Sequence, residues 1–218
     1  MSPPIDFYTN VFLPALKEMG CEVHIDLKRR GYYPKGGGLV DVSVSPAQHV
    51  RGFVLQNREH EIQGVSHSCG LPAHIAERQA KSAKRILKEA GYDAALKTEI
   101  EERGKWTTGC GITLWRGYKS GSALGERGKR AEFVGEEAAR NIIKELESAA
   151  TVDVHLADQL VPYIALSKGK SEIKVREMTK HLETNIYITQ KFLNVVFEVE
   201  KERTKEGKEV FVIKKEQS

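Results

Sequence analysis

One histidine in this sequence has a setting that suits nucleophilic chemistry. His181 follows Thr179, a residue type that caps helices, at the start of a segment with helical periodicity. The apolar stripe of that segment consists of Leu182, Ile186 and Leu193, extended by Phe192. The positive end of the helix dipole favours the neutral imidazole, and the nearby backbone N–H groups favour a bound phosphoryl group. His181 is therefore a candidate nucleophile, and the alternative is a histidine that only caps the helix or lines the surface.

A second polar group lies on a helix predicted over residues 152–166. Asp158 and Gln159 interrupt an otherwise apolar helix whose inward side is formed by Leu156, Leu160 and Ile164. Polar side chains on such a helix need hydrogen-bond partners if they are buried. The pair is therefore either a structural hydrogen-bond cluster or a group that holds a ligand.

The loop 31–38, with the sequence GYYPKGGG, joins two predicted strands and lies beside basic residues. Arg29, Arg30 and Lys35 are near enough in sequence to meet a phosphate bound by this loop. The spacing and the residues that follow differ from those of a Walker A loop. A flexible hairpin turn is the favoured interpretation, with phosphate binding as the alternative.

The cysteines and histidines do not predict a metal site. Cys21, Cys69 and Cys110 include no CxxC pair, and their odd number does not suggest a disulfide framework. His67 and His74 flank Cys69, but the spacing matches no common metal site. We therefore expect packed or solvated side chains at these positions.

Composition is that of a soluble globular protein. The 218 residues are 40% hydrophobic and 29% charged, and the apolar runs are too short to span a bilayer. The N-terminus lacks the charged and apolar regions of a signal peptide, which makes a cytoplasmic location the expectation, without a membrane partner. The net charge of +4 is compatible with a nucleic-acid or nucleotide partner, but many proteins without such partners are equally basic.

Periodicity predicts helices and strands mixed along the chain. A helix is expected from Ile5 to Gly20, which would end it, with a kink or a late start caused by Pro14. The further elements are strands at 21–30 and 39–45, two short strands within 51–66, a helix at 72–90, strands at 94–100 and 111–115, helices at 132–147 and 152–166, a strand at 172–178, the His181 helix, and strands at 195–202 and 209–215. The glycine-rich, basic segment 118–129 receives no element. The middle of the chain therefore suggests a small α/β module.

Six segments, in order, resemble the RNA 3′-terminal phosphate cyclase family, most closely its archaeal members. Together they cover nearly the whole chain: SPPIDFYTNVFLPALKEMG, LKRRGYYPKGGGLV, GVSHSCGLPAHIAERQAK, the GxALGERGK run with the EEAA helix after it, HLADQLVPYIAL and HLETNIYITQKFL. The resemblance implies an α+β fold, in which a large cyclase domain of βαβαββ-type repeats is interrupted by a small α/β insert domain. It places the large domain at 1–46 and 149–218 and the insert at 47–148.

The resemblance also implies roles for individual residues. His181 matches the family's nucleophile, which ATP adenylylates, and Pro4 matches a proline that packs on one face of the adenine. The adenylate-binding segment of the family matches His155, Leu156, Ala157, Asp158 and Gln159. His155 stands where the family usually has a larger aromatic ring, and an imidazole stacks over a smaller face.

The resemblance implies two cofactors, ATP and a divalent cation (Mg²⁺ or Mn²⁺). It also implies a partner, an RNA with a 3′-phosphate end. The expected product is a 2′,3′-cyclic phosphodiester, formed through a histidine-AMP and an RNA-adenylate. The family's N-terminal portion, with its metal-associated glutamate and RNA-binding arginines, is expected upstream of Met1. The chain alone is then expected to be a weak cyclase and to need the missing half or to self-associate. The alternatives are a non-catalytic cyclase-like protein of ribosome assembly and an inactive nucleotide-binding fragment.

Overall fold

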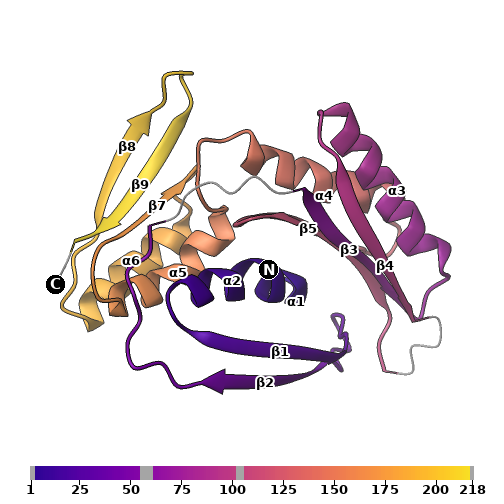
Figure 1. Cartoon of the computed structure of the whole chain (residues 1–218). Helices are drawn as coiled ribbons and strands as arrows, with labels where there is room; N and C mark the ends of the chain where they lie inside the picture. The colour runs from indigo at the N-terminus through magenta and orange to yellow at the C-terminus, as the bar shows by residue number, and fades with distance from the viewer. Residues whose placement is uncertain (1–2, 55–60, 102–105, 217–218) are drawn as a thin grey trace.

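The structure, a computed structural model, describes residues 3–54, 61–101 and 106–216. It confirms the predicted α+β class, since helices and strands are mixed along the chain and the strands form separate sheets. Figure 1 shows the N-terminal helix in the middle of the molecule, with the three sheets arranged around it.

The first helix is continuous but irregular. It consists of α1 (Ile5–Phe7), the π-helical turn η1 (Tyr8–Phe12) and α2 (Leu13–Glu18). The irregularity predicted from Pro14 takes the form of this wider turn: proline has no N–H for the helical ladder, and just before it Leu13 N–H donates to Tyr8 O, five residues back. Gly20 ends the helix with a φ of +84°, as expected for a C′ glycine.

An antiparallel hairpin follows the helix, as predicted. Strand β1 (Glu22–Arg29) pairs with β2 (Leu39–Ser45) in a two-stranded sheet, and the glycine-rich loop joins them. All seven residues of β2 are exposed, so the alternation of apolar and polar residues in this strand does not mark a buried face here. Helix α1 to α2 lies along this hairpin in Figure 1.

The middle of the chain folds into a four-stranded sheet with two helices on one face (Figure 1). Its elements are β3 (Ile62–Cys69), α3 (His74–Glu89), β4 (Ala94–Glu101), β5 (Gly109–Arg116), β6 (Lys119–Leu124) and α4 (Ala131–Leu146), with the strands in the order β4-β3-β5-β6. Strands β3 and β4 are parallel, and the other pairs are antiparallel. The sheet and helices enclose a core that includes Leu87, Ile112, Leu114, Val134 and Ile142. The insert boundaries at 47 and 148 stay a prediction.

One expectation for this region needs correction, and a second is tested only in part. The segment 118–129 contains the edge strand β6, which the sequence did not reveal because glycine and serine replace the usual apolar residues. Gly121 is required there because helix α4 packs so closely that a Cβ would lie 2.3 Å from the backbone nitrogen of Ile142. Only one regular strand, β3, begins within the described part of 51–66. Arg51 and Val54 form isolated bridges to Lys168 and Glu172, and residues 55–60 lie outside the described residues.

The C-terminal segment has the order helix, strand, helix, strand, strand. Its elements are α5 (Val154–Leu166), β7 (Ser171–Val175), α6 (Lys180–Phe192), β8 (Glu198–Arg203) and β9 (Glu209–Lys215), and the antiparallel sheet has the order β7-β9-β8. Leu182 and Ile186 are buried, as the stripe on α6 predicts. Phe192 is 84% exposed, so its inclusion in that stripe was wrong: the helix ends there, and the ring extends beyond the packed face.

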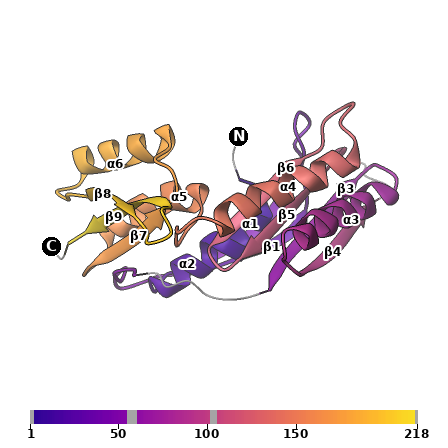
Figure 2. The ribbon, with the colours of Figure 1, turned by 90° about the horizontal axis from the view of Figure 1, so that it is seen from above.

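The two ends of the chain share one hydrophobic core. Phe7, Val11 and Leu16 from the first helix pack in the same cluster as Leu160 of α5 and Leu182 of α6. Figure 2, seen from above, shows α2 and α5 lying between the C-terminal sheet and the middle sheet. This shared core fixes the first helix against α5, and the candidate site lies at that contact. None of the helices in the described part of the chain is long and apolar enough to cross a membrane.

Candidate functional site

The N-terminus of α6 presents His181 to solvent. Thr179 is the N-cap, and its hydroxyl oxygen accepts a hydrogen bond of 3.2 Å from the backbone N–H of Leu182. His181 is the second residue of the helix and is exposed, while Leu182 anchors the same turn in the core. The predicted cap and helix start are thus confirmed, and the imidazole is free to approach a ligand beside the first helical turn.

Helix α5 supplies the second part of the site. Its N-cap is Asp153, whose buried carboxylate accepts hydrogen bonds from the backbone N–H groups of His155 (2.9 Å) and Leu156 (2.7 Å). Ser120 of β6 donates a further bond of 2.6 Å to the same carboxylate. Asp153 thereby fixes the first turn of α5 against the middle sheet, and the residues that follow project from a firmly held helix start.

The five-residue segment predicted to bind adenylate divides into two groups. His155 is exposed and Asp158 and Gln159 are half-buried, so their side chains are accessible. Leu156 and Ala157 are fully buried in the core, so neither their side chains nor their backbone is exposed at this surface. The Gln159 side-chain amide donates to the Asp158 carboxylate at 3.0 Å, so these two residues act as one polar unit.

Helices α5 and α6 bring His155, Asp158 and His181 together. Burial raises the pKa of the Asp158 carboxyl, while the hydrogen bond from Gln159 and the charges of His155 and His181 oppose that rise. The two imidazoles are therefore close enough to act electrostatically on one carboxylate. Asn185, one turn after His181, donates a hydrogen bond of 3.0 Å to the carbonyl oxygen of Asp158.

That carbonyl is available because of a proline. In a regular helix, the N–H of residue 162 would donate to the carbonyl of Asp158, but Pro162 lies inside α5 and has no N–H. Asn185 fills the gap from the neighbouring helix. Sequence reasoning missed this role of Asn185, although two signals were present: its spacing of four from His181, and the proline four residues after Asp158.

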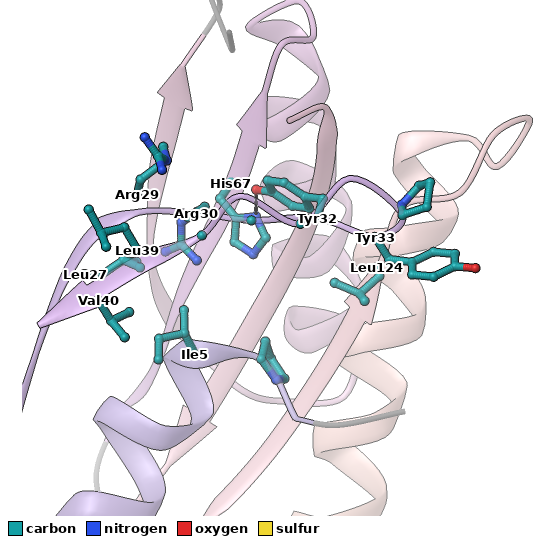
Figure 3. Close-up of a pocket in the computed structure, with 15 residues that line it drawn as sticks. Ile5, Leu27, Arg29, Arg30, Tyr32, Tyr33, Leu39, Val40, His67 and Leu124 are labelled. Carbon is teal, nitrogen blue, oxygen red and sulfur yellow. Dashed lines mark hydrogen bonds between the residues drawn. The ribbon is translucent and has the colours of Figure 1, made fainter. Parts of the chain in front are cut away.

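The first helix contributes Tyr8 and, before it, Pro4. The turn η1, which carries Tyr8, contacts α5. Burial raises the pKa of the Tyr8 hydroxyl, and the Asp158 carboxylate raises it further. Sequence reasoning gave Tyr8 no role at the site, although its hydroxyl was a signal for a polar neighbour. Pro4 is half-buried directly before α1 and lines the cavity in Figure 3. Its predicted contact with adenine stays a prediction.

The basic residues of the glycine loop differ in their freedom to meet a phosphate. Arg30 does not fit that role: its guanidinium donates two hydrogen bonds to Asp6 (2.7 and 2.8 Å) and also pairs with Glu99. Arg29 lies over the ring of Trp106, with 4.9 Å from its guanidinium carbon to the ring centre. Lys35 is exposed, so it is the residue of this set that best keeps the expected role.

Among residues 3–54, 61–101 and 106–216, no group of three or more His, Cys, Asp or Glu side chains is arranged to hold a metal ion. His67, considered in the sequence for a metal site, is instead bonded to Tyr32, whose hydroxyl oxygen lies 2.5 Å from Nδ1.

Comparison with known proteins assigns the chain to a family. The family profile described as RNA 3′-terminal phosphate cyclase matches residues 1–199, which include the helices that carry His155, Asp158 and His181. The chain belongs to the RNA 3′-terminal phosphate cyclase family. This membership confirms the resemblance seen in the sequence.

Curated relatives named RNA 3′-terminal phosphate cyclase give the same result. The chain is 48% identical over 199 residues to the protein of Archaeoglobus fulgidus, covering 91% of this chain and 60% of the relative. It is 49% identical over 206 residues to the Methanosarcina barkeri protein (94% and 60%) and 42% identical over 220 residues to the Pyrococcus furiosus protein (98% and 63%). This chain thus spans about 60% of the length of the first two relatives.

Proposed function

We propose that this protein acts in the ATP-dependent conversion of an RNA 3′-terminal phosphate to a 2′,3′-cyclic phosphodiester, with His181 as the nucleophile. The observation that best supports the proposal is the position of His181: it is exposed at the N-terminus of α6, and Asn185, one turn later, bonds this helix to Asp158 of α5. Curated relatives are named RNA 3′-terminal phosphate cyclase, and the region that the family profile matches contains His181, Asp158 and His155.

In the first step, a ring nitrogen of His181 attacks the α-phosphorus of ATP. An N–P bond forms, the bond from that phosphorus to the bridging oxygen breaks, and pyrophosphate leaves with the electron pair. The backbone N–H groups of the first turn of α6 favour the negative charge of the bound phosphoryl group. Asp158 and Gln159 hold the nucleoside by hydrogen bonds, while His155 and Pro4 enclose the adenine between two flat faces.

In the second step, an oxygen of the RNA 3′-phosphate attacks the phosphorus of the histidine-AMP, which releases His181 and gives an RNA-adenylate. The neighbouring 2′-hydroxyl then attacks the 3′-phosphorus, loses its proton, and expels AMP as the ring closes. Because the attack is intramolecular, it depends on positioning more than on a strong base. Mg²⁺ or Mn²⁺ belongs to the proposal as a charge-neutralising ion for ATP, and the cytoplasm is the proposed location.

Incubation with ATP labelled at the α-phosphate tests the first step. We expect an acid-labile covalent label on the wild-type chain and none on His181→Asn, whose amide has no basic nitrogen. His24, an exposed histidine on β1, provides the matched control, and His24→Asn should label as the wild type does. Peptide mass spectrometry should place AMP on His181, and AMP on any other residue would exclude the assignment. Reversible ATP binding without a label would favour a nucleotide-binding fragment, and no binding would favour a non-catalytic relative.

A further inference from the structure

A cavity of about 500 Å³ lies where three segments meet: the start of α1, the glycine loop of the hairpin, and the middle sheet (Figure 3). Its walls are mainly apolar, with Ile5, Leu27, Val40 and Leu124 around the polar residues of its floor. This volume is typical of sites for small ligands or single groups of a larger ligand. Of the residues proposed to bind ATP, only Pro4 lines it, so most of the cavity is not accounted for by the ATP site.

Two arginines line the cavity: Arg29 lies over the ring of Trp106 and donates to the carbonyl oxygen of Gly37 (2.6 Å), whereas Arg30 is paired with carboxylates. Arg30 is bound in a bidentate pair to Asp6 and also donates to Glu99. Burial opposes the charge of Arg30, but the two carboxylates outweigh it and raise its pKa. The charge of Arg30 is thus balanced by two carboxylates, and the guanidinium of Arg29, over Trp106, carries the positive charge on the cavity wall.

The remaining polar group of the floor is a neutral imidazole. His67 is 3% exposed, and burial together with Arg30 lowers its pKa to about 3. The Asp6 carboxylate lies 3.8 Å from Nε2 and favours the tautomer that carries its proton there, and in that tautomer Nδ1 accepts from the Tyr32 hydroxyl. Within the described residues, Nε2 is buried and has no hydrogen-bond partner. The cavity floor therefore holds one unused, uncharged N–H donor.

We propose that this cavity binds one nucleobase of the RNA substrate, near its 3′ end. A neutral ring fits apolar walls and an uncharged donor, and a carbonyl oxygen or ring nitrogen of a base can accept the bond from His67. The exposed Lys35 belongs to the loop that borders the cavity, so positive charge for the adjoining phosphates also lies outside it. The inference rests on the proposed function, because that function makes RNA the substrate.

A bulky residue at the cavity rim provides the test. Val40 lines the cavity and is 39% exposed, whereas Val44 lies four residues further along the same strand, is 66% exposed and is not a lining residue. Val40→Trp should fill the cavity, and Val44→Trp adds the same ring to the same face of β2 as a matched control. Thermal melting of both variants establishes that they are folded.

The probe is a fluorescent RNA octamer with a 3′-phosphate, compared with octamers that have an abasic nucleotide at one of the last four positions. We expect one abasic position to weaken binding to the wild-type chain about tenfold, a size typical of a lost base contact. Val40→Trp should weaken binding of the intact octamer by a similar factor and show no further loss at that position. Val44→Trp should bind as the wild type does, within about twofold.

Three outcomes would overturn the proposal. The wild-type chain binds all octamers equally, the two tryptophan variants bind the intact octamer equally, or the wild-type chain binds no RNA. Loss of the ATP label in Val40→Trp but not in Val44→Trp, with RNA binding kept, would show that the cavity holds the adenine of ATP. A wild-type chain that binds RNA in a base-dependent way but takes no ATP label would contradict the proposed function and leave the base site intact.

Discussion

The side-chain amide of Asn185 donates to the main-chain carbonyl of Asp158 at 3.0 Å, and this bond joins α6 to α5 beside His181. Pro162 leaves that carbonyl without its helical donor, so the two helices are joined at a defect of α5. Because Asn185 lies one turn after His181 on the same helix, the bond also fixes where His181 stands relative to Asp158.

Removal of the Asn185 side chain should therefore affect both stability and the proposed adenylylation. We expect Asn185→Ala to lower the free energy of unfolding by about 1 kcal/mol, because the Asp158 carbonyl loses its partner, and to slow labelling by ATP. Thr184→Ala is the control, since the Thr184 hydroxyl bonds to Lys180 within the same helix. Urea unfolding and the rate of label incorporation measure the two effects.

A second substitution separates these effects. Pro162 is exposed, and Pro162→Ala restores an N–H that can donate to the Asp158 carbonyl. The double variant Asn185→Ala with Pro162→Ala should recover the lost stability but remain slow to label, because the link between α5 and α6 is still absent. Full recovery of labelling in the double variant would show that the link does not position His181.

The Asp158 carboxylate should be needed for use of ATP rather than for folding. It is half-buried, and its one described side-chain partner is the neighbouring Gln159. We expect Asp158→Ala to remove the rise in melting temperature that ATP causes in the wild type, with little change in the melting temperature without ATP. If the carboxylate is instead a structural acceptor, melting without ATP should show a loss of about 1–3 kcal/mol. An unaltered ATP response would remove Asp158 from the site.

Local patterns predicted most of the elements of this fold. The cap at Thr179, the glycine at Gly20 and the periodicity of the long helices each depend on neighbours in sequence, and the structure confirms them. The edge strand β6 was missed because Gly121 is set by the close approach of α4, a contact between distant segments. Phe192 was placed in the core because periodicity does not show where a helix runs past its packing partner.

The candidate site was predictable only in part for the same reason. A resemblance to known motifs and a helix start identified His181 and Asp158, which the structure brings together through the contact of α5 and α6. The pairing of Arg30 with Asp6 spans 24 residues, and that of His67 with Tyr32 spans 35. Side chains that meet only through tertiary packing leave no periodic signal in the sequence, so phosphate binding by Arg30 remained open as an alternative.

Asp153 should make stability depend on pH. Its carboxyl is completely buried, and burial raises its pKa to about 6, although the hydrogen bonds from Ser120, Leu156 and His155 oppose the rise. In the unfolded chain the pKa is about 4, so the unfolded state releases this proton more readily. The contribution of Asp153 is thus fully present below about pH 4 and is lost as the pH rises through about 6.

The substitution Asp153→Asn removes this titration while its carbonyl oxygen can still cap α5. We expect the free energy of unfolding of the wild type, relative to that of the variant, to fall by about 2–3 kcal/mol between pH 4 and pH 7. Urea unfolding of both proteins across this range gives the difference directly. A difference that stays constant with pH would show that Asp153 does not titrate in this range.

The buried pair of Asp6 and Arg30 should be important for holding the first helix against the hairpin. Asp6 is 5% exposed and receives both guanidinium hydrogen bonds, whereas the second partner, Glu99, has a side chain that is 54% exposed. Breaking a buried pair strands a charge, so Asp6→Ala should lower the free energy of unfolding by about 3–5 kcal/mol. Glu99→Ala should cost less than about 1 kcal/mol, because exposed pairs contribute little.

The double variant Asp6→Leu with Arg30→Met decides whether the lost stability comes from a stranded charge or from the loss of the pair itself. Two apolar side chains leave no buried charge, so we expect this variant to be clearly more stable than Asp6→Ala. Since Pro4 precedes Asp6 by two residues, the rate of labelling by ATP in the double variant also shows whether the pair positions the start of α1. A double variant less stable than Asp6→Ala would mean that the charge-assisted bonds, and not the avoidance of an unpaired charge, hold this junction.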